Sequence, residues 1–511
     1  MDQFYVATLS VSMLVISVII YMKLILKPGG HRRPSPPGPR GLPVVGYLPF
    51  LGDNLLHDFK DLEQKYGPIF KLHLGHKLYT VISSPPLVKE VVRDHDAVFA
   101  NRDTPVAVTV ATFGGNDIAW SPHNSEWRAM RKIFVQEMMS SRSFDESYNL
   151  RREEIRKVIK HIYDGMIGKA TEMGDLCFPA ELNVLINMSW GGTVAGELGE
   201  RVAAEVRAVV AKIPDLVGKP NVSDYYPFLA WLDVQGIKRQ MENYVESLDK
   251  ILDVVIAEHT NELAGDQVKR ERRDYLQILL ELNDEGDRGT SKITRKQLKA
   301  ILMDVVAGGA DTSATVEWAM AELMNNPEVM ATVQKELNDV VGLNKIVEES
   351  HTPELKYLEA VVKETLRLHP PVPLLVPRSP SRSSTIGGYT IPEGSGVFIN
   401  IWSIQRDPSI WDMPMEFNPQ RFLHGNYDYS GNQFQYLPFG SGRRICAGRA
   451  LSERMILYLL ASLLHSFDWR LPQGGDDDQL DMSETYGLVL RKSTPLIVIP
   501  TPRLPDSTFY M

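Results

Sequence analysis

The group with the clearest chemical potential in this sequence is the thiol of Cys446, one of only 2 cysteines in 511 residues. It lies in the segment Pro438–Arg449, where glycines permit close backbone approach and arginines make the surroundings electropositive. Such surroundings lower the pKa of a thiol toward the thiolate, which acts as a nucleophile or a metal ligand. A buried structural cysteine is the simpler interpretation of any single thiol, so the wider pattern has to decide.

A second candidate segment is Val306–Thr315, where two adjacent glycines precede Asp311 and Thr312 in a long apolar run. Each glycine weakens a helix by roughly 1 kcal/mol relative to alanine. The simpler interpretation is a kink in which a side chain bonds back to the backbone. The functional interpretation is a gap for a flat ligand, with Asp311 and Thr312 transferring protons.

Two further pairs of residues that could take part in binding have helical spacing. Trp127 and Arg131 are four residues apart on an amphipathic pattern, and Glu364 and Arg367 are three apart, so each pair shares a helix face. A solvated arginine beside a packed tryptophan, and a weak surface ion pair, are the default interpretations.

The pattern around the thiol carries a resemblance. Phe439, Gly442, Arg444, Cys446 and Gly448 fill the positions of Phe-x-x-Gly-x-Arg-x-Cys-x-Gly. This segment resembles the haem-binding loop of the cytochrome P-450 family of haem-thiolate monooxygenases. The resemblance implies haem b as cofactor, with Cys446 as the axial thiolate ligand of its iron.

The other segments match further motifs of that family in the same order. Gly309–Ser313 resembles its oxygen-activation motif, which implies proton delivery by Asp311 and Thr312. Trp127 and Arg131 resemble its Trp-x-x-x-Arg, whose side chains contact the haem propionates. We expect the cofactor to be held by Trp127, Arg131, Arg378, Phe439, Arg444, Cys446 and Gly448.

Glu364-x-x-Arg367 looks like a structural motif of the family that braces the haem loop through a further arginine. That arginine is Arg421, in Pro419-Gln420-Arg421-Phe422. The commoner family sequence is Pro-Glu-Arg-Phe, so glutamine here removes any role for an acid at position 420.

The composition of the chain indicates which classes of protein could contain these motifs. Apolar residues make up 43% and charged residues 23%, as in ordinary globular proteins, and the net charge of −9 gives no support to nucleic-acid binding. Two cysteines make a disulfide framework implausible. The resemblance implies a mainly α fold with small β-sheets, with haem between the helix of Thr312 and the loop of Cys446.

The N-terminus predicts a membrane anchor. Residues 4–26 are almost entirely apolar, long enough to span a bilayer, and basic residues follow them, which places the body of the protein in the cytosol. A cleaved signal peptide is the alternative, but such peptides carry their basic residues first. We expect a single-pass anchor (1–26), a proline-rich hinge (27–46) and a haem domain (47–511), at the endoplasmic reticulum by resemblance.

The remaining pattern predicts strands near Ile69–Leu74 and Tyr79–Ser83, a loop over Val106–Trp120 and a hairpin at Tyr486–Leu490. Residues 140–300 have a helical pattern, with breaks expected at Pro179, Pro214 and Pro227. Apolar candidates for the substrate pocket are Phe113, Val306, Leu374, Leu375 and Leu488.

The implied reaction is monooxygenation with O2 and electrons from an NADPH-cytochrome reductase, docked on a basic patch of Arg131, Lys132, Arg443 and Arg449. Several segments look like a plant microsomal subgroup that contains cadinene-type sesquiterpene hydroxylases and flavonoid hydroxylases. We expect a small lipophilic metabolite, a terpenoid ahead of a flavone or other phenolic. Two alternatives are a reductase-independent dehydratase or isomerase, and a membrane-anchored binding protein without catalysis.

Overall fold

The computed structural model describes residues 34–511 except 192–195, 265–273, 285–292, 426 and 473–479. The predicted anchor and most of the predicted hinge lie outside these residues. No helix within the described residues is both long and apolar enough to cross a membrane. Residues 34–46 lie along the first strand, where Lys71 N–H donates to the Pro37 carbonyl at 2.8 Å.

Helices make up most of the fold, as predicted. The α-helices are α2 (Leu55–Tyr66), α3 (Pro85–Lys89), α4 (Val106–Ala111), α5 (Ser125–Ile133), α6 (Ser141–Glu146), α7 (Tyr148–Gly165), α8 (Met173–Trp190), α9 (Gly196–Val210), α10 (Ile213–Gly218), α11 (Val222–Tyr225), α12 (Ile237–Ala264), α13 (Tyr275–Asp284), α14 (Arg295–Gly308), α15 (Ala310–Asn325), α16 (Pro327–Val340), α17 (Lys356–Leu368), α18 (Ile401–Ile404), α19 (Gln420–His424) and α20 (Arg449–Ser466).

Short 3₁₀ and π segments connect these helices. They are η1 (Leu48–Phe50), η2 (Glu90–Asp94), η3 (Val98–Ala100), η4 (Phe134–Met138), η5 (Pro227–Leu232), η6 (Glu349–Glu354), η7 (Gly442–Arg444) and η8 (Ser507–Tyr510). Of these, η7 belongs to the loop that carries Cys446.

The strands form small sheets, as predicted. They are β1 (Ile69–Leu74), β2 (Lys77–Ile82), β3 (Asn101–Arg102), β4 (Thr171–Glu172), β5 (Arg378–Ser379), β6 (Ser384–Ile386), β7 (Tyr389–Ile391), β8 (Gly396–Ile399), β9 (Phe467–Arg470), β10 (Glu484–Thr485), β11 (Arg491–Lys492) and β12 (Ile497–Pro502). The largest sheet has the order β1-β2-β8-β5-β3, and β2 and β8 are its parallel pair. The others are β4-β12-β9, β6-β7 and β10-β11, the last being the expected hairpin.

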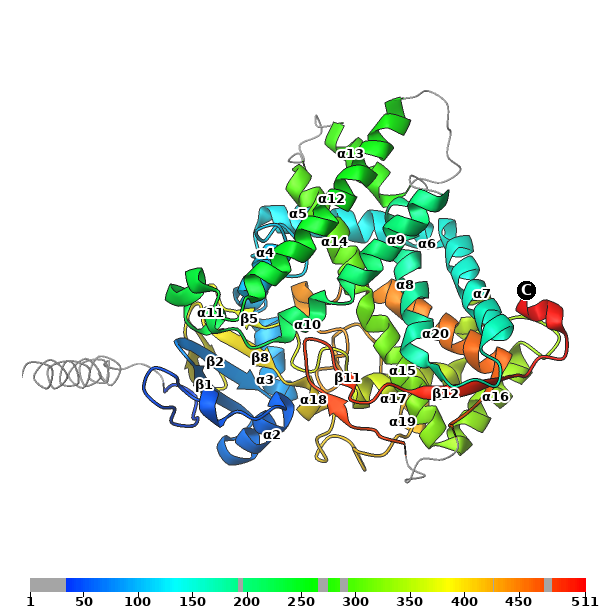
Figure 1. The fold of residues 1–511 in the computed structure, drawn as a ribbon. Coiled ribbons are helices and arrows are strands. Elements are labelled where there is room, and N and C mark those ends of the chain that lie inside the picture. The colour runs from blue at the N-terminus through cyan, green and yellow to red at the C-terminus, as the bar shows by residue number, and fades with distance from the viewer. Residues whose placement is uncertain (1–33, 192–195, 265–273, 285–292, 426, 473–479) are drawn as a thin grey trace, which may run out of the picture.

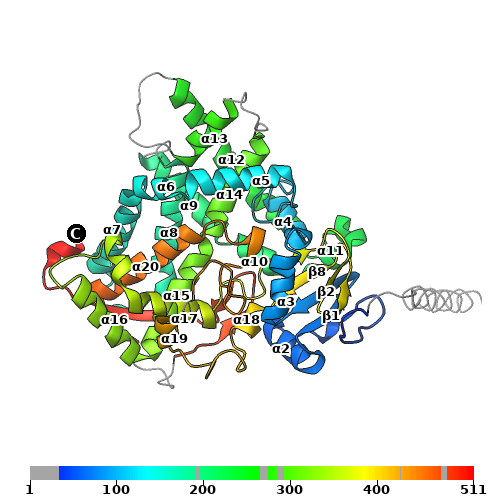
Figure 2. The ribbon, with the colours of Figure 1, turned by 180° about the vertical axis from the view of Figure 1, so that it is seen from behind.

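The core helices lie at the centre of the molecule and the largest sheet lies at one end (Figure 1). Helix α15 packs against α8, α17 and α20, and the reverse view shows α20 crossing behind it (Figure 2). This arrangement places the start of α15, which carries Thr312, near the start of α20, which follows Cys446.

Two local predictions are wrong. Pro179 does not break the chain but lies inside α8. Most of α8 is buried, and this packing outweighs the roughly 3 kcal/mol that an internal proline costs. The expected loop Val106–Trp120 begins with a helix, α4, whose first N–H, at Val106, donates to the Asp224 carboxylate at 2.6 Å. That cap comes from a distant segment, which local periodicity does not reveal.

Candidate functional site

The loop of Cys446 presents its thiol to a cavity of about 330 Å³ between α15, α20 and the segment 371–378. Cys446 N–H donates to the Phe439 carbonyl at 2.9 Å, which closes the loop. Gly442 has φ +68°, and a Cβ there would lie 2.5 Å from the Val92 carbonyl oxygen, so only glycine fits. Cys446 also precedes the N-terminus of α20, whose dipole favours a thiolate.

Arginines line one side of this cavity. They are Arg102, Arg131, Arg378 and Arg444. Burial and the nearby guanidinium of Arg378 lower the pKa of Arg444 to about 9. Burial also lowers the pKa of Arg378 to about 10, against the opposing effect of Asp96, 3.6 Å away. The pKa of Arg102 is lowered by burial and by repulsion from Arg378 and Arg444.

These arginines bind main-chain carbonyls but retain their mutual repulsion. Arg378 donates to the Ser441 carbonyl at 2.8 Å, Arg102 to Val376 at 2.7 Å and Arg444 to Ala100 at 2.6 Å. An anionic ligand in the cavity would relieve the repulsion between them. A flat macrocycle with two carboxylates and a metal that binds thiolate, namely haem, fits this arrangement: the arginines would hold its carboxylates and Cys446 its iron.

The helix opposite Cys446 breaks at the glycine pair, as the sequence indicates: α14 ends at Gly308 and α15 begins at Ala310. Asp304, Gly308 and Thr312, spaced by four residues, all line the cavity. Thr312 Oγ1 lies 3.3 Å from Ser452 Oγ of α20, so two hydroxyls meet on the cavity wall. The side chain of Asp311 lies outside the described part of the structure.

The two glycines have different surroundings, and this gives a prediction. A Cβ at Gly308 would meet nothing within 4 Å, whereas one at Gly309 would lie 1.8 Å from Leu185 Cδ1. We expect Gly309→Ala to destabilise the fold by about 1–3 kcal/mol through overpacking, and Gly308→Ala to stabilise it by up to about 1 kcal/mol through helix propensity. Urea denaturation midpoints measure both, and equal shifts would contradict the assignment.

Glu364, Arg367 and Arg421 meet in the interior. Arg367 donates to both oxygens of Glu364, at 2.6 and 2.8 Å, and Arg421 Nε donates to Glu364 Oε1 at 3.0 Å. Both Glu364 and Arg367 are fully buried. Arg367 also binds the Pro414 and Glu416 carbonyls, so this triad holds the segment that leads to the Cys446 loop.

The structure brings some predicted ligands to the cavity and not others. Arg131, Arg378, Phe439, Arg444 and Gly448 line it with Cys446. Trp127 is not a lining residue: its indole N–H donates to the Ile118 carbonyl at 2.8 Å, and Arg444 stacks 4.1 Å from its ring centroid. Trp127 therefore supports the arginine instead of pointing into the cavity.

Of the five apolar pocket candidates, only Leu375 lines the cavity. Val306 and Leu374 are buried in the hydrophobic core, and their chain neighbours Val305 and Leu375 line the cavity instead. Phe113, at φ +51°, packs against the core around α12 and α14. Leu488, at the hairpin tip, lies beside Gly218 of α10.

The polar or small cavity residues that sequence reasoning missed include Arg102, Ala119, Glu181, Asp304 and Ser452. The one available signal was the helical spacing of Asp304 from Gly308 and Thr312. Arg102, Ala119 and Glu181 come from segments that only the tertiary structure brings together.

Of the four residues of the predicted basic patch, Lys132 and Arg443 are exposed and Arg131 and Arg449 are half-buried. Arg131 faces the cavity, Arg443 pairs with Asp96 at 2.8 Å and Arg449 pairs with Glu453 at 3.3 Å. Lys132 is exposed, and it has no charged partner among the described residues. Local sequence shows the charges but not the acids that neutralise them.

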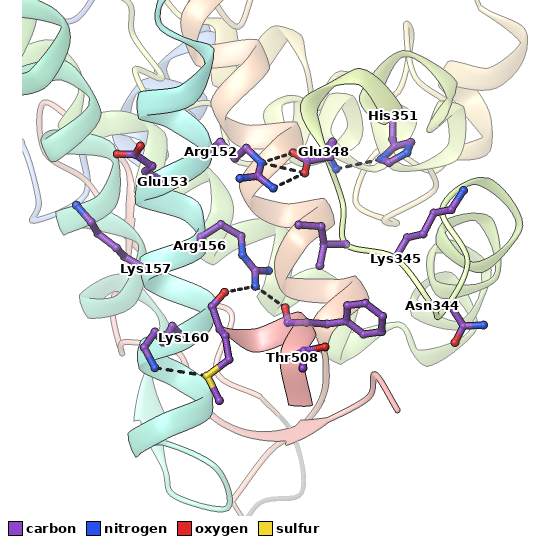
Figure 3. A pocket seen from close by; sticks show the side chains of 13 residues that line it. Arg152, Glu153, Arg156, Lys157, Lys160, Asn344, Lys345, Glu348, His351 and Thr508 are labelled. Carbon is purple, nitrogen blue, oxygen red and sulfur yellow. Dashed lines mark hydrogen bonds and ion pairs between the residues drawn. The ribbon is translucent and has the colours of Figure 1, made fainter. Parts of the chain in front are cut away.

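A second cavity, of about 900 Å³, opens at the surface between α7, the loop before η6 and the C-terminal segment (Figure 3). Arg152 pairs with Glu348, and Arg156 donates to the Phe509 and Met511 carbonyls (Figure 3). Lys160 contacts the sulfur of Met511 in the same view and also pairs with Asp164. Most of the cations that line this cavity therefore have a partner within the described residues, and no arginine cluster like that of the first cavity is found there among those residues.

Comparisons with known proteins agree with the haem-binding interpretation of this cavity. The family model described as Cytochrome P450 matches residues 36–499. A flavonoid 3'-monooxygenase of Oryza sativa subsp. japonica is 36% identical, over 98% of both chains. A ferruginol synthase of Isodon rubescens is 37% identical, over 92% of this chain and 95% of that protein.

Solved structures agree with the fold. A zebrafish cytochrome P450 crystallised with progesterone has a TM-score of 0.75 and 26% sequence identity, and the match covers 88% of this chain and all of that one (100%). The likeness therefore extends over nearly the whole described chain.

Proposed function

The chain belongs to the cytochrome P450 family, as a haem-thiolate monooxygenase, and on that premise we propose that it hydroxylates a small lipophilic plant metabolite, a terpenoid in the first place. The observation that carries the terpenoid proposal is the aliphatic cavity wall. Its apolar side chains include Val184, Leu185, Val305, Val372, Leu375 and Val376. Such a wall suits a saturated ring skeleton, which makes no directional polar contacts.

Flavonoids are the second candidate class. Relatives named flavonoid 3'-monooxygenases share 36% identity with this chain, close to the 37% of a ferruginol synthase. At this identity the substrate of a relative does not transfer, so both classes belong in the test.

The chain's own residues have distinct tasks in this reaction. When bound, haem supplies the oxygen-activating chemistry, with Cys446 as its thiolate ligand. The arginines orient the cofactor through its carboxylates. Thr312, on the helix opposite Cys446, and Ser452, on α20, both line the cavity with their hydroxyls 3.3 Å apart, so these hydroxyls can hold and pass a proton. The aliphatic wall orients the substrate and excludes water.

The test is expression in microsomes with an NADPH-cytochrome reductase and a panel of terpenes and flavonoids, with products identified by mass. We expect a product 16 mass units heavier that requires O2, NADPH and reductase, since one oxygen atom is inserted. Turnover without NADPH would favour a dehydratase or isomerase instead. Binding spectra without any product over the panel would favour a binding protein.

We also propose that the protein lies on the endoplasmic reticulum membrane, with part of its folded surface in contact with lipid. Phe228 and Trp231 of η5 are 64% and 79% exposed, and Val44 and Phe50 nearby are each 52% exposed. The two segments are joined because Tyr226 Oη donates to the Val44 carbonyl at 3.3 Å. They lie where the chain emerges from the predicted anchor and hinge.

This proposal predicts lipid contact at Trp231, because tryptophan prefers the membrane interface. In nanodiscs that contain brominated lipid, quenching of tryptophan emission should be smaller for the full-length Trp231→Phe variant than for wild type. Trp469→Phe, at a half-buried strand position, should leave the quenched component unchanged. Equal quenching in wild type and Trp231→Phe would refute contact at this surface.

A further inference from the structure

The loop Asn116–Ser121, between α4 and α5, forms part of the cavity wall through Ile118 and Ala119. Its carbonyls accept hydrogen bonds from the indole and guanidinium groups around the cavity: Ile118 accepts from Trp127 and Arg444, and Ala119 accepts from Arg102 at 3.1 Å. The side of the cavity that holds the cofactor's carboxylates is therefore bonded directly to this loop.

The N–H groups of the same loop face two acids. Ile118 N–H donates to the Asp304 carboxyl of α14 at 2.5 Å, and Trp120 N–H donates to Asp117 Oδ2 at 2.8 Å. Asp117 also accepts from the Ser121 hydroxyl at 3.1 Å. The loop is thus held from α14 as well as from the arginines.

The two acids also lie next to each other. Asp117 is fully buried, and its carboxyl lies within hydrogen-bonding reach of the Asp304 carboxyl. Two carboxyl groups can share a hydrogen bond only if one of them carries a proton, because two carboxylates repel. Burial and the neighbouring Asp117 raise the pKa of Asp304 well above its ordinary value, and burial raises the pKa of Asp117.

The surroundings of the pair contain further titratable groups. Arg102 of β3 and Arg444 of the Cys446 loop face Asp117 and favour its charged form. The hydroxyl of Tyr275, on α13, faces Asp304. These neighbours favour the state in which Asp117 carries the charge and Asp304 the proton.

We propose that Asp304 is a positioning residue for substrate selection: with Asp117 it forms a proton-sharing carboxyl pair that fixes the loop Asn116–Ser121 over the cavity. This proposal rests on the proposed monooxygenase function in one respect only, namely that the substrate binds in this cavity. The loop is held while the pair keeps its proton. Because the pKa of Asp304 is raised, the contact is present at lower pH and lost as pH rises through that raised value.

The test uses full-length holoenzyme and two iron-binding probes, imidazole and 4-phenylimidazole, titrated by the shift of the haem absorption band. Imidazole is too small to need the loop, so its affinity serves as the reference. In Asp304→Leu the affinity for 4-phenylimidazole relative to imidazole should fall by about tenfold, the order of change expected when one hydrogen bond that holds the loop is lost. An unchanged ratio would overturn the proposal.

Asp304→Asn gives the sharper result. Its amide can donate to the Asp117 carboxylate and accept from Ile118 N–H at every pH, so the affinity ratio should stay constant over the pH range in which the wild-type ratio declines. A variant that follows the wild-type pH profile would overturn the proposal. Asp249→Asn, which removes an acid paired with Lys299 on another face of α14, should behave as wild type.

Neither experiment depends on the native substrate. If the azoles bind and the ratios shift as described, the positioning role stands even when no terpene or flavonoid is hydroxylated. If products form but the ratios stay constant in Asp304→Leu, the positioning role fails while the proposed function stands.

Discussion

Cys446→Ser is expected to abolish hydroxylation, with a loss larger than the roughly 100-fold that removal of a metal ligand's supporting partner can cause. A serine hydroxyl does not supply the electron-rich thiolate that promotes O–O cleavage. The measurement is product formation in reductase-containing microsomes, together with the absorption band of the reduced carbon monoxide complex. In Cys446→Ser this band should no longer lie at the wavelength that is characteristic of a thiolate-ligated haem.

The matched control is Cys177→Ala, at the other cysteine. Cys177 is fully buried in a hydrophobic cluster with Met173 and Val316, outside the cavity wall. This change should lower stability only, by the cost of a small core cavity, and leave the thiolate band in place. Hydroxylation that survives in Cys446→Ser would show that the ligand assignment is wrong.

Glu364→Gln is expected to have the largest effect on stability, about 3–5 kcal/mol, because it leaves the buried guanidinium of Arg367 without its charged partner. Arg421 loses the same charged partner, and the amide NH2 that replaces one carboxylate oxygen faces the Nε–H donor of Arg367. Since these groups hold the segment before the Cys446 loop, haem retention should fall with stability. Urea denaturation and the ratio of haem to protein measure the two effects.

An exposed ion pair offers the comparison. Arg142 and Glu146 lie four residues apart, with 82% and 39% of their side chains exposed, and contact at 2.7 Å. Glu146→Gln should leave the urea midpoint close to that of wild type, since solvent screens such pairs. If Glu364→Gln unfolded at the same urea concentration as Glu146→Gln, the bracing role of the triad would be refuted.

The sequence supports the fold prediction because the motifs are local and occur in a fixed order. A glycine–arginine loop before an apolar helix, or two charges three residues apart on a helix, keeps its internal geometry wherever the element packs. For the same reason the glycine pair at 308 and 309 correctly marks the break between α14 and α15. Pro179 shows the limit, since packing of a buried helix outweighed the local preference.

The cavity wall shows what local pattern leaves undecided. Val306 and Leu374 were each one residue away from a side chain that does line the cavity. The rotation of α14 about its own axis, set by packing against α8, decides which valine faces inward. Trp127 does not line the cavity for another reason: its indole N–H donates to the main-chain carbonyl of Ile118, which lies in a loop nine residues earlier in the sequence.

By itself, the sequence determined the family, the thiol of Cys446, the spacing of Glu364 and Arg367, and the weak point beside Thr312. Only the tertiary structure decided that Arg102 joins the expected Arg378 and Arg444 at the cavity, and that Asp304 lies beside Asp117. The physical reason is that charges and hydrogen bonds act over a few ångströms in space, whichever residues the fold brings there. Composition and spacing constrain a single element, whereas a site is assembled from many.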